Sequence, residues 1–303
     1  MASYQNDELV IKVPQEFSFK ENISYMSRSS NECMFEIRDN IVVKAIPLKD
    51  EVRLVRISEN TEGNLVIHFI EDIHFVSETV RDEVNQYVRE WFDLDNDLKP
   101  FYEMAKKDDL LQNAVDEFYG LRNIGIPDLF EAIVWGILGQ QINLAYAYTL
   151  KRRLVETFGR SIEWEGHRYW IFPKAEDIAN LTVEDLAPLK MTVKKCEYLI
   201  GVAQLIVEGS LSKSLIKGTG NLKEAEKILV KIRGIGPWTA NYVLMRCLRF
   251  PSAFPIDDVG LHNAIKHLTG TVEKPTKEEI SKLAVPWRGW ESYATFYLWR
   301  FLY

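Results

Sequence analysis

The stretch at residues 230–242 constrains this chain more than any other part of the sequence. It joins two amphipathic helical patterns, the first at 222–229 and the second beginning at Pro237. Between them, Gly234 and Gly236 can take backbone angles that are closed to other residues, and a proline suits the first turn of a helix. A Gly-x-Gly turn that opens onto a helix N-terminus points bare amide N–H groups outward, and such groups bind phosphate. By itself the short motif favours an ordinary connector between two helices over a binding site.

Four short motifs occur in the same order as in a known family. They are Leu129-Phe130-Glu131-Ala132 through Ile137-Leu138-Gly139-Gln140-Gln141, then Phe172-Pro173, then Gly234-Ile235-Gly236-Pro237-Trp238-Thr239-Ala240-Asn241-Tyr242 with Pro255-Ile256-Asp257-Asp258, and finally Trp287-Arg288-Gly289-Trp290-Glu291-Ser292-Tyr293-Ala294. The chain therefore resembles the helix-hairpin-helix DNA glycosylases, and among them the DNA-3-methyladenine glycosylase II type, which excises alkylated bases. The resemblance covers roughly residues 100–303, about two thirds of the chain.

Composition sets the limits on the fold and its location. The chain has 303 residues, 47% of them hydrophobic, which is enough for two or three domains with a sizeable core. It contains no apolar run of about 18 residues, so we expect no transmembrane helix and no membrane partner. Its acidic start lacks the apolar core of a signal peptide, and we expect a cytoplasmic protein.

The three cysteines are isolated from one another, at Cys33, Cys196 and Cys247. They form neither a CxxC pair nor a zinc-binding spacing. Some members of the related family carry a four-cysteine iron–sulfur cluster after the catalytic region. No cysteine follows Cys247, so that cluster is excluded, and we expect neither a redox cofactor nor a catalytic metal.

The net charge of −7 is unevenly distributed. Residues 191–250 contain ten basic and four acidic side chains, a net charge of +6, which leaves −13 for the rest of the chain. A basic segment on an acidic body suggests that one face meets a polyanion. The alternative is a set of solvated helix faces with no partner.

The periodicity predicts an α+β protein in two parts. Residues 1–98 are expected to form an antiparallel sheet with strands at 34–38, 41–46, 52–57 and 65–70, a tight turn at Asp39-Asn40, and a helix from Ser77 to about Leu94. Residues 99–303 are expected to be helical. The predicted helices are 101–107, 109–119, 127–158, 175–180, 183–187, 193–208, 225–231, 237–249, 260–268, 277–285 and 291–301.

Asp258 is the predicted catalytic residue. Cleavage of an N-glycosidic bond builds positive charge on the sugar, and a carboxylate near the anomeric carbon stabilises that charge and can orient or deprotonate water. In the family motif the second of two adjacent acids is the catalytic one, which corresponds to Asp258. For Asp257 we expect only a helix-capping role.

Trp238 distinguishes two reaction types. In family members that also nick the DNA strand, the corresponding residue is a lysine whose amine attacks the sugar and forms a Schiff base. An indole cannot act as a nucleophile, and Lys231 lies on the other side of the turn. The resemblance therefore implies a monofunctional enzyme that hydrolyses the bond with water.

The base pocket is expected to be aromatic. Trp238 and Tyr242 are spaced i, i+4 on one helix face, and Trp290 corresponds to a pocket tryptophan of the family. An electron-rich ring attracts a positively charged alkylated base by roughly 0.5–2 kcal/mol. Ile23 and Tyr25 are expected at the N-terminal side of the pocket. Two departures from the family, Ile23 and Val259, each replace an aromatic residue, whereas Trp287, Tyr297 and Trp299 are interpreted as ordinary core residues.

The remaining DNA contacts follow from the resemblance alone. Gln141 corresponds to the wedge that fills the gap left by a flipped base, although the DNA-3-methyladenine glycosylase II type has an apolar residue there. The predicted phosphate contacts are Gly234, Ile235, Gly236 and Thr239. Family hairpins also hold a monovalent cation through backbone carbonyls, which here are those of Val230, Ile232 and Ile235.

The sequence therefore predicts a monomeric, monofunctional DNA glycosylase that binds double-stranded DNA containing alkylated bases, such as 3-methyladenine. Two alternatives remain. One is an oxidised-purine glycosylase of the same fold, against which Trp238 weighs. The other is a non-catalytic helix-hairpin-helix DNA-binding protein, which would usually lack both the downstream acid and the aromatic helix face.

Overall fold

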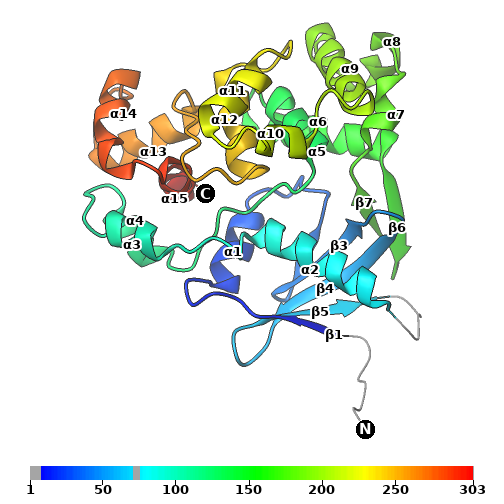
Figure 1. Cartoon of the computed structure of the whole chain (residues 1–303), viewed down its shortest axis with the longest axis horizontal. Helices are drawn as coiled ribbons and strands as arrows, with labels where there is room; N and C mark the ends of the chain where they lie inside the picture. The colour runs from blue at the N-terminus through cyan, green and yellow to red at the C-terminus, as the bar shows by residue number, and fades with distance from the viewer. Residues whose placement is uncertain (1–7, 71–75, 303) are drawn as a thin grey trace.

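The computed structural model describes residues 8–70 and 76–302, and these form a sheet-containing N-terminal part and a helical C-terminal part (Figure 1). The predicted antiparallel sheet is confirmed, but it has five strands, in the order β1-β5-β4-β3-β2, where four were predicted; β1 was missed. Its strands are β1 (Glu8–Ile11), β2 (Glu36–Arg38), β3 (Ile41–Pro47), β4 (Val52–Glu59) and β5 (Leu65–Phe69). Asp39 and Asn40 link β2 to β3 with φ angles of 48° and 59°, which confirms the tight turn.

Two helices pack with this sheet. Helix α2 (Glu78–Phe92) begins at Ser77, whose Oγ accepts a hydrogen bond from the Val80 N–H, and it buries Val84 and Val88 completely. The capped helix is therefore confirmed. Helix α1 (Phe19–Met26) was not predicted, because eight residues give too little periodicity for detection. Figure 1 shows both helices between the sheet and the helices of the C-terminal part.

The C-terminal part contains most of the helices and one small hairpin of strands. The helices are α3 (Lys99–Ala105), α4 (Gln112–Glu117), α5 (Leu129–Leu138), α6 (Leu144–Phe158), α7 (Ala175–Ala179), α8 (Val183–Leu186), α9 (Val193–Val207), α10 (Lys213–Lys217), α11 (Leu222–Val230), α12 (Pro237–Arg246), α13 (Val259–Thr269), α14 (Lys277–Leu283) and α15 (Glu291–Trp299). Short 3₁₀ turns lie at Ala187–Leu189, Val285–Trp287 and Arg300–Leu302. The strands β6 (Arg160–Trp164) and β7 (His167–Ile171) pair antiparallel, and Tyr169 and Ile171 pack on β3 and β4.

The predicted single helix at 127–158 is wrong. The chain forms two helices there, α5 and α6, separated by a turn at residues 139–143. Gln141 adopts a left-handed conformation with φ of 57°, which no α-helix can continue through. Asn143 then caps α6 by accepting a hydrogen bond from the Tyr146 N–H. The polar pair Gln140-Gln141 was the sequence signal for this break.

The buried core is continuous across the two parts of the chain. One cluster joins Ile46 of the sheet, Val84 of α2 and Ile133 of α5. Arg122, completely buried, donates hydrogen bonds to the carbonyl oxygens of Asp93 and Glu16 and so fastens the junction. The boundary between residues 98 and 99 therefore stays a prediction. In the described parts of the chain, no helix combines the length and apolar character needed to cross a bilayer.

Candidate active site

The turn between α11 and α12 has the geometry expected of a phosphate-binding hairpin. Gly234 has φ of +93°, and a Cβ there would lie 2.3 Å from the ring of Tyr198, so both the conformation and the space require glycine. Gly236 precedes α12 and makes no side-chain capping bond. The first amide N–H groups of a helix have no partner within the helix, so those of α12 are free to meet an anion.

Asp258 is held by three donors from three parts of the fold. Its Oδ1 accepts hydrogen bonds from the Leu261 N–H and from the indole Nε1 of Trp299, both at 2.8 Å. Its Oδ2 accepts one from the indole Nε1 of Trp238 at 2.9 Å. Charge-assisted bonds of this kind stabilise an ionised carboxylate and fix its position. Asp258 is also the N-cap of α13, which is the capping role that we had expected for Asp257.

Asp257 lies at the rim of the site but takes no part in these hydrogen bonds. Its side chain is exposed and forms an ion pair with Lys277, with 2.8 Å between Oδ2 and Nζ. The hydrogen bonds of Asp258 thus distinguish the two acids, as the sequence comparison with the family had done.

A cavity of about 770 Å³ opens beside Asp258. Trp238 and Tyr242 line it, with stacked rings 5.6 Å apart, and the ring of Trp299 lies 6.3 Å from that of Tyr242. Gly260 lies at the back of the carboxylate, where a Cβ would come within 2.8 Å of Oδ1 of Asp258. The aromatic helix face predicted for α12 therefore meets the predicted acid in one cavity.

Trp290 does not lie in this cavity. It precedes α15 and packs against Phe101 and Tyr293, at ring distances of 6.0 and 5.4 Å. Trp299, at the other end of α15, lines the cavity where Trp290 was predicted, so its interpretation as an ordinary core residue is wrong. Nine residues of helix separate the two tryptophans by about 13 Å, so only one of them can reach Asp258. The sequence signal that could have identified Trp299 is that a buried indole N–H needs a hydrogen-bond acceptor.

The N-terminal contribution to the cavity also differs from the prediction. Tyr25 lines the cavity, as expected, but Ile23 is 5% exposed and belongs to the core. Alternate positions along α1 face different ways, so these two residues could not both point into it. Two cationic side chains, Arg28 and Arg246, line the cavity as well and were not predicted. Neither belongs to one of the four motifs.

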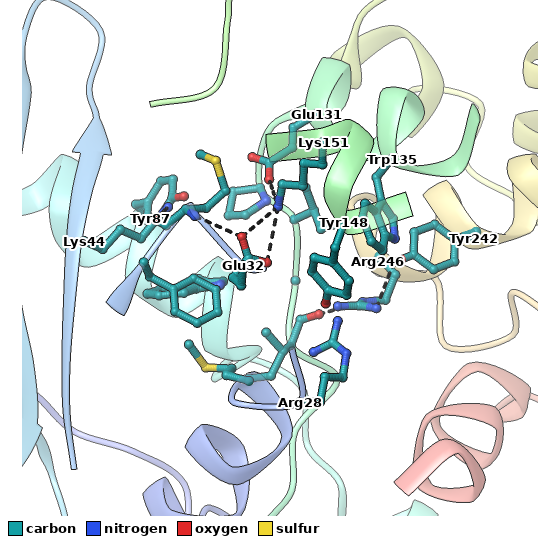
Figure 2. Close-up of a pocket in the computed structure, with 18 residues that line it drawn as sticks. Arg28, Glu32, Lys44, Tyr87, Glu131, Trp135, Tyr148, Lys151, Tyr242 and Arg246 are labelled. Atoms are coloured by element: carbon teal, nitrogen blue, oxygen red, sulfur yellow. Dashed lines mark hydrogen bonds and ion pairs between the residues drawn. The ribbon is translucent and has the colours of Figure 1, made fainter. Parts of the chain in front are cut away.

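A smaller buried pocket of about 50 Å³ lies behind the cavity (Figure 2). Lys151 there forms ion pairs with Glu32 and Glu131, at 3.2 and 3.3 Å. Burial opposes the charge of Lys151, but the two carboxylates outweigh it and raise its pKa. Burial likewise opposes the charge of Glu32. The positive charge of Lys151 and a hydrogen bond from the Met34 N–H outweigh the effect of burial, so the pKa of the Glu32 carboxyl is lowered. Tyr242 and Arg246 line both spaces.

Gln141 lies exposed at the rim of the cavity, in the turn between α5 and α6. The turn is fastened by its neighbour Gln140, whose Nε2 donates to the Gly234 carbonyl at 2.9 Å and to Thr239 Oγ1 at 3.0 Å. Lys195 fastens it from α9 through hydrogen bonds to the carbonyls of Leu138 and Gln140. A wedge needs a rigid support, and this turn has one.

Thr239 and the basic segment correct two further predictions. The side chain of Thr239 is 1% exposed and its hydroxyl accepts the bond from Gln140, so it cannot contact a ligand. The side chain of Ile235 is buried too, which leaves the backbone for any contact there.

Four of the ten basic side chains of residues 191–250 bind carbonyls or acids inside the protein, namely Lys195, Lys213, Arg246 and Arg249. The six exposed ones are Lys194, Lys217, Lys223, Lys227, Lys231 and Arg233.

The sequence matches two protein-family models that together span nearly the whole chain. Residues 134–289 match the model of the HhH-GPD superfamily base excision DNA repair protein. Residues 8–133 match the N-terminal domain of 8-oxoguanine DNA glycosylase.

Individual proteins give the same result. The chain is 57% identical to a DNA-3-methyladenine glycosylase of Bacillus subtilis (strain 168) over 298 residues, which are 98% of each protein. In fold it is similar to the 3-methyladenine DNA-glycosylase from Archaeoglobus fulgidus, with a TM-score of 0.82, 23% identity and 97% of each chain covered. It is also similar to the 8-oxoguanine glycosylase/lyase of Clostridium acetobutylicum in complex with double-stranded DNA, with a TM-score of 0.76, 21% identity and coverage of 98% and 95%. The resemblance inferred from the four motifs is therefore confirmed, and the chain belongs to the HhH-GPD superfamily of base excision DNA repair proteins.

Proposed function

We propose that this protein is a monofunctional DNA glycosylase that releases alkylated purines such as 3-methyladenine from double-stranded DNA by hydrolysis. One observation carries the proposal: a carboxylate fixed by two indoles lies in an aromatic cavity beside a phosphate-binding hairpin. The 57% identity to a DNA-3-methyladenine glycosylase supports the choice of substrate. We expect the enzyme to act as a monomer.

In this mechanism Asp258 stabilises the positive charge that develops on the sugar as the glycosidic bond breaks. The base leaves with the bonding electrons, and water adds to the anomeric carbon and loses a proton. A carboxylate has about four lone-pair positions, and three of those of Asp258 already accept hydrogen bonds. The remaining one is on Oδ2, and it would face the sugar or the attacking water.

The absence of a nucleophilic amine supports hydrolysis over strand cleavage. None of the described residues that line the cavity is a lysine. Trp238 occupies the position at which a strand-nicking enzyme would carry its lysine, and its indole N–H is bound to Asp258. The residues of the cavity that the structure describes therefore offer no amine that could form a Schiff base with the sugar.

The DNA backbone would be held at the hairpin through main-chain groups. We assign phosphate binding to the amides of Gly234 and Gly236, because the Ile235 N–H already donates to the Ile232 carbonyl. We assign the wedge to Gln141, at the rim of the cavity. A flipped base would leave the stack next to Gln141 and enter the cavity under Tyr242.

We also propose a monovalent cation at the backbone carbonyls of Val230, Ile232 and Ile235. The donor chemistry fits, because neutral backbone carbonyl oxygens are suitable ligands for a monovalent cation. The Ile232 carbonyl already accepts a bond from the Ile235 N–H and retains a second lone pair. The cation would strengthen phosphate binding. DNA affinity should therefore fall when K⁺ and Na⁺ are replaced by a bulky organic cation at equal ionic strength.

The deciding experiment is base release from methylated duplex DNA, with the free bases separated by chromatography. We expect free 3-methyladenine, an abasic product strand that stays intact, and no protein–DNA adduct after borohydride treatment. A borohydride-trapped adduct would contradict the hydrolytic mechanism. Release of oxidised guanine in place of methylated purines would support the alternative suggested by the match of residues 8–133. DNA binding without release of any base would leave only a binding function.

A further inference from the structure

Arg28 lines both the cavity beside Asp258 and the buried pocket behind it. Its guanidinium stacks on the ring of Tyr25, with 4.1 Å from the guanidinium carbon to the ring centre, and lies 5.7 Å from the ring of Tyr148. Figure 2 shows it below Tyr148 and beside Arg246. Two aromatic rings therefore hold this cation at the wall of the proposed base pocket.

The two arginines of the cavity differ in how far their donors are used. Arg246 donates to the Ile124 carbonyl at 2.7 Å and to the Tyr242 hydroxyl at 3.0 Å, so it fastens α12 to its neighbours. Among the described residues, the guanidinium of Arg28 donates one hydrogen bond, from Nη1 to the Tyr25 carbonyl at 3.1 Å. A guanidinium carries five N–H donors. Arg28 consequently has donors left for a molecule in the cavity.

The nearby acid does not take up those donors. Both carboxylate oxygens of Glu32 accept hydrogen bonds from Lys151, and one of them also accepts the Met34 N–H. The carboxylate of Glu32 is thus engaged by Lys151, as Figure 2 shows. Arg28 therefore presents to the cavity a fixed positive charge with directed N–H groups.

We propose that Arg28 is a specificity-determining residue that donates a hydrogen bond to the 6-carbonyl oxygen of a flipped purine. This proposal rests on the function proposed above. Guanine derivatives carry a carbonyl acceptor at position 6, whereas adenine derivatives carry an amino donor there. An N–H donor in the pocket therefore favours 7-methylguanine over 3-methyladenine, which presents an N–H group to the same donor.

The charge of Arg28 does not produce this preference. Both 7-methylguanine and 3-methyladenine are positively charged while attached to the sugar, so a cation in the pocket repels both. Removing the guanidinium should speed or leave unchanged the release of 3-methyladenine. Only the release of 7-methylguanine loses a hydrogen bond to a charged group. The ratio of the two rates isolates the contribution of the donor.

The test uses one substrate, duplex DNA treated with a methylating agent, which contains both lesions. Arg28→Met should lower the ratio of 7-methylguanine to 3-methyladenine release by about tenfold, the effect of losing one hydrogen bond to a charged group. Arg28→Lys, which keeps the charge and some donors, should recover part of the ratio. As a matched control, Arg152→Met removes an arginine that binds the neighbouring carbonyls of Asn31 and Glu32 but does not line the cavity, and should leave the ratio unchanged.

An unchanged ratio in Arg28→Met, or an equal fall in both rates, would overturn the proposal, since a merely structural arginine would affect both lesions alike. The same holds if Arg152→Met shifts the ratio as strongly. Release of neither base by the wild-type enzyme would instead overturn the proposed function, and this proposal with it.

Discussion

Trp299 donates its indole N–H to Oδ1 of Asp258 at 2.8 Å from a position 41 residues further along the chain. Trp299 is the last residue of α15, and Asp258 is the N-cap of α13. The position of the carboxylate therefore depends on how these two helices pack together. Trp238 supplies the second indole donor, from α12. The acid is therefore positioned by tertiary packing, and the cost of disturbing that packing should appear in catalysis.

The first prediction concerns this donor. Trp299→Phe keeps a ring in the cavity wall but removes the hydrogen bond, so base release should slow by about tenfold, the effect of one lost bond to a charged group. Single-turnover kinetics on methylated DNA measure the change. The control is Trp290→Phe at the other end of the same helix, which should retain near-normal rates. Equal loss in both variants would contradict the placement of Trp299 in the site.

The second prediction separates the two adjacent acids. Asp258→Asn removes the charge that stabilises the sugar cation and should slow release by roughly a thousandfold, comparable with the loss of other electrostatic catalytic groups. Asparagine is an equally good N-cap, so folding and binding to abasic DNA should persist. Asp257→Asn removes only an exposed ion pair with Lys277 and should leave the rate within about twofold. Near-normal release by Asp258→Asn would remove the basis of the mechanism.

The third prediction uses Gly260, which borders the carboxylate. In Gly260→Ala the new Cβ would lie 2.8 Å from Oδ1 of Asp258 and 3.1 Å from Nε1 of Trp299, so the acid has to shift. Release should fall by at least about tenfold, because a small displacement of a catalytic group is costly. Stability should not fall in proportion, since alanine favours a helix over glycine by roughly 0.5–1 kcal/mol.

Gly201→Ala in α9 is the matched control for that substitution. Nothing lies within 4 Å of a Cβ at Gly201, so this variant should gain stability and keep full activity. Thermal melting and base release on the two variants decide the question. Full activity of Gly260→Ala would show that the contact with Asp258 is not required.

The sequence predicted well those features that depend on neighbouring residues. The turn at Asp39-Asn40, the cap at Ser77 and the Gly-x-Gly hairpin each follow from local backbone chemistry, and the structure has them. The pairing of Trp238 with Tyr242 on one face of α12 is likewise a matter of helical spacing.

The remainder of the site depends on contacts between distant segments. Trp299 and Trp290 look alike in sequence, and only the docking of α15 decides which one reaches Asp258. Arg28 follows a short helix that was itself missed, and its neighbours Tyr148 and Arg246 come from α6 and α12. Lys195 counted as a surface charge in the sequence and instead fastens the turn that carries Gln141, and burial lowers its pKa. Composition cannot assign such charges to the interior or the surface.

The fourth prediction concerns the buried ion cluster of Figure 2. Lys151 is 8% exposed and neutralises Glu32 and Glu131, which are 11% and 12% exposed at their side chains. Lys151→Met would leave two buried carboxylates without the cation that pairs with both of them. It should lower the free energy of unfolding by about 3–5 kcal/mol at neutral pH. Urea denaturation of the variant and the wild type measures this difference in the free energy of unfolding. Lys277→Met, which breaks the exposed pair with Asp257, should cost less than about 1 kcal/mol.

The stability of that variant should depend on pH over a range in which the cluster of the wild type adds no pH dependence. In the wild type the lowered pKa of Glu32 contributes stability above its unfolded value of 4.5, and this contribution is lost as the pH falls through the folded value. The raised pKa of Lys151 contributes fully below its unfolded value of 10.5 and is lost as the pH rises through the folded value. Between these limits the cluster adds no slope. Without Lys151, burial raises the pKa of the Glu32 carboxyl, so this group binds a proton more readily in the folded protein. The stability of Lys151→Met should therefore increase as the pH falls from 8 to 5. A destabilisation that stays constant or grows over that range would show that the two carboxylates find other partners.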